Sequence, residues 1–195
     1  METSKTANWG AIALVIAAQA GFLGWMVWER ASLLKSGREI SLKVIPIDPT
    51  DLFRGDYVIL GYEISPVVVE KAKQGPLPDA VTWGAPVYVT ITPDAAKGWI
   101  STGLSTSFPA NVAPGDAVLK GVVTTIDGDQ RSETRSVRVQ FGIENYFVPE
   151  GEGREIEKKV REHQVEAVVA VGADGEAALK ALSVGGKHIH EQPLL

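Results

Sequence analysis

The apolar residues of the chain are concentrated in one run near its start and alternate with polar residues along the rest. Residues 9–28 contain no charged side chain, and Gln19 is their only strongly polar one. At about 1.5 Å per residue, an α-helix of this length is about 30 Å long, which matches the hydrocarbon core of a bilayer. Trp9 stands at one end, and Trp25 and Trp28 stand at the other, where tryptophan rings prefer the headgroup level. The pattern predicts a transmembrane helix.

Two other structures could produce such a run. A buried core helix would carry a polar stripe on one face, and this segment has none. A cleaved signal peptide would have a shorter apolar region, of about 7 to 15 residues, followed by a small-x-small cleavage site. Residues 27–31, which end and follow the run, make a poor site of that kind. We therefore expect a permanent anchor and a single-pass protein of the cell membrane.

The charges that flank the run give conflicting signals about its orientation. Lys5 and the terminal amine precede the run, whereas Arg30, Lys35, Arg38 and Lys43 follow it. The positive-inside rule therefore favours a cytoplasmic C-terminal part. A β-rich domain without cysteine behind a single N-terminal anchor is, however, commonly carried outward. We expect an extracytoplasmic domain, and a reporter that is active in only one compartment, fused to the C-terminus, would test this orientation.

Behind the anchor, apolar and polar residues alternate in short runs that the prolines separate. Apolar side chains at every second position over about four to eight residues are typical of strands with one buried face. The expected fold is mainly β (α+β): an N-terminal transmembrane helix followed by one antiparallel β-rich domain with one short helix. The alternating runs contain Ile40, Leu42 and Val44; Val58, Leu60, Tyr62 and Ile64; Val87, Val89 and Ile91; Val137, Val139, Phe141 and Ile143; and Val165, Ala167, Val169 and Val171.

Turn-forming dipeptides and one charged segment mark the connections between these runs. Asp127-Gly128 closes one apolar run, and Asp174-Gly175 is expected to form a two-residue hairpin turn. Residues 152–163 predict the short helix, because Ile156 and Val160 lie on one face of it among charged side chains.

Three further segments leave their structure open. Residues 67–73 could form a short helical turn, residues 176–182 have a helical composition at a strand position, and residues 96–113 could be an irregular strand or a loop. The expected organisation is an N-terminal flank (1–8), the anchor (9–28), a juxtamembrane linker (29–38), the β-rich domain (39–187) and a C-terminal tail (188–195).

Composition excludes several classes of function. The 195 residues include 19 lysines and arginines, 24 aspartates and glutamates, and no cysteine, and the net charge is −5. Without cysteine the chain cannot form a disulfide, a thiolate metal site or an iron–sulfur cluster, and it has no thiol nucleophile. An acidic chain without a basic cluster is a poor match for nucleic acid, because binding to phosphates requires clustered lysine and arginine.

The most informative stretch is residues 55–62, Gly-Asp-Tyr-Val-Ile-Leu-Gly-Tyr, which fits the pattern G-D-Y-x-x-L-x-Y at every position. A second stretch, residues 146–151 (Tyr-Phe-Val-Pro-Glu-Gly), is followed by Gly153 and by Ile156-Glu157. In these two motifs and their order the chain resembles the GDYXXLXY family, bacterial membrane-anchored proteins of unknown function. The resemblance spans nearly the whole chain, the anchor included. It implies no established activity, but members often look like neighbours of multi-pass membrane proteins, which implies an integral membrane partner.

Polar residues in and near the two motifs are the candidates for a binding surface. Tyr62 and Leu60 are expected on one face of a strand and Tyr57 on the other. In one interpretation Asp56 stabilises a turn and the tyrosines pack in the core, so that the motif is structural. In the other, the motif forms a polar binding surface, and Glu150 could lie beside Asp56 as a paired carboxylate or metal site. The candidate binding residues are Asp48, Arg54, Asp56, Tyr57, Tyr62 and Glu150.

The sequence contains no evident catalytic constellation. Residues 49–58 are similar to the segment that follows the nucleophilic serine in signal-peptidase-like proteases, but the residues just before Pro49 include no serine, which removes the Ser/Lys mechanism. His188 and His190 could share a strand face as metal ligands, but a solvated tail is the simpler interpretation. We expect no catalytic residue, no bound metal and no cofactor.

Three functions remain open. We favour a membrane-anchored, non-enzymatic accessory or interaction module that is held in the lipid bilayer by residues 9–28 and acts with an integral membrane partner. The alternative is a small-molecule, glycan or metal-binding hydrolase, whose polar groups would be Asp48, Asp56, Tyr57 and Glu150. A third possibility is an envelope scaffold in which both motifs serve only the fold.

Overall fold

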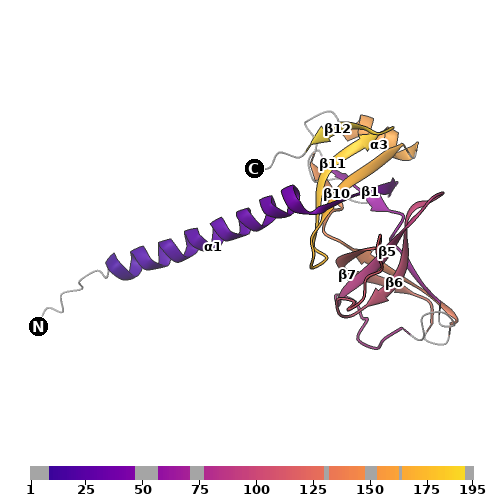
Figure 1. Ribbon diagram of the computed structural model, residues 1–195, viewed down its shortest axis with the longest axis horizontal. Coiled ribbons are helices and arrows are strands. Elements are labelled where there is room, and N and C mark those ends of the chain that lie inside the picture. Colours follow the sequence, from indigo (N-terminus) through magenta and orange to yellow (C-terminus); the bar gives the residue numbers. More distant parts are fainter. Residues whose placement is uncertain are drawn as a thin grey trace, which may run out of the picture.

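The structure is a computed structural model that describes residues 9–46, 57–70, 77–129, 132–147, 153–162 and 164–191. A long helix, α1 (Trp9–Ser36), projects from one side of a β-rich body (Figure 1). The side chains of residues 9–30 are all exposed, and the helix is long and apolar enough to cross a membrane. The helix continues beyond Trp28 because the residues that follow are good helix formers. Most of the expected linker (29–38) is therefore helical.

The strands of the described residues form two antiparallel five-stranded sheets and one strand pair. The first sheet has the order β12 (Lys187–Glu191), β11 (Ala177–Val184), β10 (Val165–Val171), β1 (Arg38–Ile45) and β3 (Gly61–Tyr62). The second has the order β4 (Val67–Glu70), β8 (Thr134–Gln140), β7 (Ala117–Asp127), β5 (Pro86–Asp94) and β6 (Gly98–Ser105). Strands β2 (Tyr57–Ile59) and β9 (Asn145–Phe147) form the pair, and α3 (Gly153–Arg161) is a short helix. The expected fold class is confirmed.

The alternating runs of the sequence supply the core of the body. In β1 the side chains of Ile40, Leu42 and Val44 are buried, whereas the residues between them are more exposed. Strand β10 differs, because both of its faces are buried. Val168 and Ala170 on one face are buried, as are Ala167, Val169 and Val171 on the other. The last turns of α1 contact β10 and β11. Figure 1 shows the end of α1 beside these two strands, with β5, β6 and β7 further along the body.

Several local expectations were wrong. Residues 67–70 form strand β4 and pair with β8 instead of forming a helical turn, because consecutive valines favour an extended chain. The β10–β11 turn is longer than two residues: the Gly172 N–H donates to the Glu176 carbonyl at 2.8 Å, and Gly175 has a φ of +88°. The expected C-terminal tail (188–195) begins inside β12, where His188 and His190 pair with β11.

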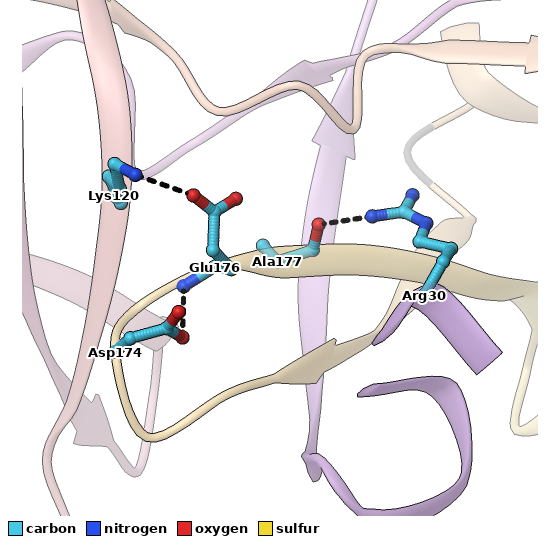
Figure 2. A network of polar contacts seen from close by, with 5 residues as sticks. All are labelled: Arg30, Lys120, Asp174, Glu176 and Ala177. Carbon is cyan, nitrogen blue, oxygen red and sulfur yellow. Dashed lines mark hydrogen bonds and ion pairs between the residues drawn. The ribbon is translucent and has the colours of Figure 1, made fainter. Parts of the chain in front are cut away.

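The β10–β11 turn, residues 172–176, is the point at which the helix and both sheets meet (Figure 2). Arg30 Nη1, in α1, donates to the Ala177 carbonyl at 3.0 Å. On the other side, the Glu176 carboxylate accepts a hydrogen bond of 2.6 Å from Lys120 Nζ, in β7 of the second sheet. The turn therefore connects the end of α1 with both sheets.

Leu33 fits the end of α1 closely against the first sheet. A Cβ atom on Gly37 or on Gly172 would lie 3.2 Å from Leu33 Cδ1. On Gly37 that atom would also lie 2.6 Å from the Leu33 carbonyl oxygen, which already accepts the Gly37 N–H at 2.8 Å. The two glycines thus leave the space that Leu33 occupies, and Gly37 allows α1 to pass into β1 with a tight turn.

Candidate functional site

A cavity of about 550 Å³ lies beside the GDY segment, bordered by β3, the end of β8 and the β8–β9 connection. Ile45, Ile59 and Leu60 contribute apolar walls. Cavities of this size that combine apolar walls with a few polar groups are typical of ligand-binding sites. The polar groups along this cavity are Tyr62, Ser65, Thr124, Arg138, Gln140, Glu144 and Asn145.

The last residues of the GDY motif form the inner wall of this cavity. Leu60 is fully buried, and its N–H donates to the Glu144 carbonyl at 2.7 Å. Tyr62 is 2% exposed, and its hydroxyl donates to the Ile143 carbonyl at 2.6 Å. Burial, with the nearby Glu144 carboxylate, raises the pKa of Tyr62 well above its usual value of 10.0. Tyr62 therefore holds the β8–β9 connection as a neutral phenol.

Ser65 fixes the opposite end of the cavity. Its hydroxyl donates to the Val139 carbonyl at 2.9 Å, and the Val139 N–H donates back to Ser65 Oγ at 3.0 Å. Since Val139 belongs to β8, this double contact holds the β3–β4 connection on the second sheet. The cavity is thus built from segments that both motifs and both sheets position.

The two sequence motifs meet in the fold. Strand β2 contains the Tyr57 of the first motif and pairs antiparallel with β9, which contains the Tyr146 and Phe147 of the second. Tyr57 lies opposite Phe147, and Val58 lies opposite Tyr146, which is fully buried. Sequence alone did not bring the motifs together, because strand pairing across so many intervening residues has no local signal.

Glu144 is the residue of this cavity that the sequence analysis missed. Its Oε1 accepts the Phe141 N–H at 2.6 Å, whereas its Oε2 is buried and has no hydrogen-bond partner among the described residues. Burial raises the pKa of the Glu144 carboxyl above its ordinary value of 4.5, against the lowering effect of nearby backbone N–H groups. The available signal was an acidic residue isolated within the apolar run of residues 141–147.

We expect Glu144→Gln to change how stability depends on pH. Because the folded pKa lies above the unfolded value, the folded wild type binds the proton more tightly, and its free energy of unfolding falls as pH rises from 4.5 through the folded pKa. Glutamine can still accept the Phe141 N–H but does not titrate. Urea unfolding at pH 4 and pH 7 should show that the variant gains stability relative to wild type as pH rises. If the two proteins differ in free energy of unfolding by the same amount at both pH values, the raised pKa of the Glu144 carboxyl is contradicted.

Most of the predicted site residues cannot be placed around this cavity. Tyr62 lies in its wall. The backbone of Tyr57 lies in β2, and its side chain is outside the description. Asp48, Arg54, Asp56 and Glu150 lie outside the described residues. A paired carboxylate of Asp56 and Glu150 is therefore not tested by the structure. No observation on the described residues supports the hydrolase hypothesis.

Comparison with known proteins gives one match. No curated protein and no solved structure matches the chain. The family model described as GDYXXLXY protein matches residues 19–182, which include the second half of α1, the cavity and both motifs. The chain thus belongs to the GDYXXLXY family.

Proposed function

We propose that this protein is a membrane-anchored, non-enzymatic accessory module that binds an integral membrane partner. The observation that carries the proposal is the exposure of α1: residues 9–30 have no contact that buries them, although residues 9–28 are uncharged. A helix that is apolar all round requires lipid or other helices around it. In this proposal α1 crosses the membrane, and the β-rich body lies on the extracytoplasmic side.

The connection between α1 and the body supports a module with a defined position relative to the membrane. Arg30 and Leu33 hold the last turns of the helix on β10 and β11, and β1 begins directly afterwards. The cavity beside the GDY segment is therefore presented in a fixed relation to the anchor. Its exposed rim residues, Arg138 and Asn145, stand next to apolar walls, a combination suited to a polypeptide segment of a partner.

Affinity purification of the full chain in mild detergent tests this proposal. From cells that naturally produce the protein, wild type should recover a multi-pass membrane protein in stoichiometric amount. Asn145→Arg, which places a long side chain at the mouth of the cavity, should lose that partner. Thr82→Arg adds the same charge at an exposed residue that does not line the cavity and should retain the partner. Recovery of the protein alone, or equal recovery from both variants, would contradict the proposal.

A further inference from the structure

A second cavity, of about 560 Å³, lies where α1 enters the β-rich body. One side is formed by the last turns of the helix, including Ser32 and Leu33. The other is formed by Phe108 and Val112, in the connection between β6 and β7, and by Ala117 at the start of β7. Phe108 and Val112 are 40% and 38% exposed, although both are large apolar side chains.

This connection is firmly attached beside the anchor. The Arg38 guanidinium donates to the Asp116 carbonyl at 2.6 Å and to the Gly115 carbonyl at 2.7 Å. The Phe108 ring packs edge-on against Tyr88 of β5, with 5.6 Å between the ring centres. The exposed apolar side chains are therefore held in a fixed position beside the end of α1.

The length of α1 beyond Trp28 gives the distance of these side chains from the hydrocarbon core of a bilayer. Between Trp28, at the end of the uncharged segment, and Ser36 the helix rises by about 12 Å at about 1.5 Å per residue. The headgroup region adds about 5 to 7 Å to each side of the hydrocarbon core. Ser32 and Leu33 thus lie near its outer boundary, and a typical helix tilt of about 20° brings one side of the body closer still.

Two cationic side chains at this level also suit a membrane surface, beside the single acidic residue of the cavity lining, Asp116. Lys35 and Arg38 are exposed in and just behind the last turn of α1, on the same part of the chain as the second cavity. Cationic side chains at this level are attracted to the phosphate groups of lipid headgroups. Exposed apolar side chains beside such cations are the composition of an interfacial membrane contact.

We infer that the β6–β7 connection is a second membrane contact, in which Phe108 and Val112 enter the headgroup layer of the bilayer that α1 crosses. This inference rests on the proposed anchoring by α1. The contact extends the lipid-facing surface from the helix to the β-rich body. It also fixes the rotation of the body about the helix axis. The second cavity then opens towards lipid headgroups.

Site-specific labelling of the full chain tests the inference directly. Because the protein contains no cysteine, a single introduced cysteine carries a unique environment-sensitive NBD label. The three variants are Val112→Cys in the contact, Trp25→Cys in the anchor and Glu133→Cys near the end of β7 that is remote from α1. Each is reconstituted into vesicles of phosphatidylcholine and phosphatidylglycerol with a headgroup spin-labelled lipid as quencher.

The inference predicts loss of fluorescence at positions 25 and 112 and none at position 133. Quenching at 25 without quenching at 112 would overturn the membrane contact and leave the anchor intact. A lack of quenching at all three positions would instead remove the anchor on which the inference depends. The label at 112 can also be compared in native membranes. If its fluorescence there shows a water-free environment, but the vesicles give no quenching, position 112 contacts a protein and the inference is overturned.

Discussion

Arginine at both Ala17 and Ala20 will prevent stable integration of the full chain into membranes. Both residues lie near the middle of the uncharged segment, and each arginine at the centre of a spanning helix costs about 2.5 to 3.5 kcal/mol. After washing of membranes at alkaline pH, wild type should stay in the pellet, whereas the double variant should be extracted or degraded.

Leucine at the same two positions is the matched control, because it enlarges the side chains without adding charge. This variant should remain in the washed membranes. An arginine variant that resists extraction as well as the leucine variant would show that α1 does not cross the bilayer. The experiment leaves the β-rich body unchanged, so its outcome concerns the helix alone.

Tyr62→Ala should lower the free energy of unfolding by about 3 to 5 kcal/mol, as for truncation of other large buried aromatic side chains. The ring is 2% exposed within the core, and its removal leaves a cavity beside Leu60. Tyr62→Phe keeps the ring but leaves the Ile143 carbonyl without its donor, which costs about 1 to 3 kcal/mol. Urea unfolding of the full chain in detergent, followed by circular dichroism, measures both effects.

The two variants also separate a structural motif from a binding motif. If Tyr62 serves only the fold, the folded fraction of Tyr62→Phe should recover as much of the proposed membrane partner as wild type does. Loss of the partner without loss of stability would give the hydroxyl a role in binding. A Tyr62→Phe protein as unstable as Tyr62→Ala would instead contradict the packing described for the ring.

The strands were predictable wherever one face is buried. Ile40, Leu42 and Val44 alternate with more exposed residues in β1, and Val87, Val89 and Ile91 do so in β5. The prediction was incomplete for residues 176–182, because β11 is buried on both faces and its alanines are also good helix formers. Residues 98–105 gave no clear signal, since their strand structure comes from pairing with β5.

The candidate site was predictable only in part, because it depends on contacts between distant segments. The GDY motif drew attention to Tyr62, which does lie in the cavity wall. The cavity itself depends on the hydrogen bond between Ser65 and Val139 and on the strand pairing that places Tyr57 opposite Phe147. Neither contact leaves a pattern in the local sequence. Glu144 was missed because a single acidic side chain in an apolar run has no sequence feature that distinguishes burial from exposure.

The place of β1 in the first sheet affects the order of folding. This strand follows α1 directly, yet its neighbour β10 begins only at Val165. Pairing between such distant segments is slow, and unpaired strand edges are prone to aggregate in the meantime. Until synthesis has reached β10, the edge of β1 that pairs with it stays open. A segment made late in synthesis therefore decides when the first strand of the chain becomes protected.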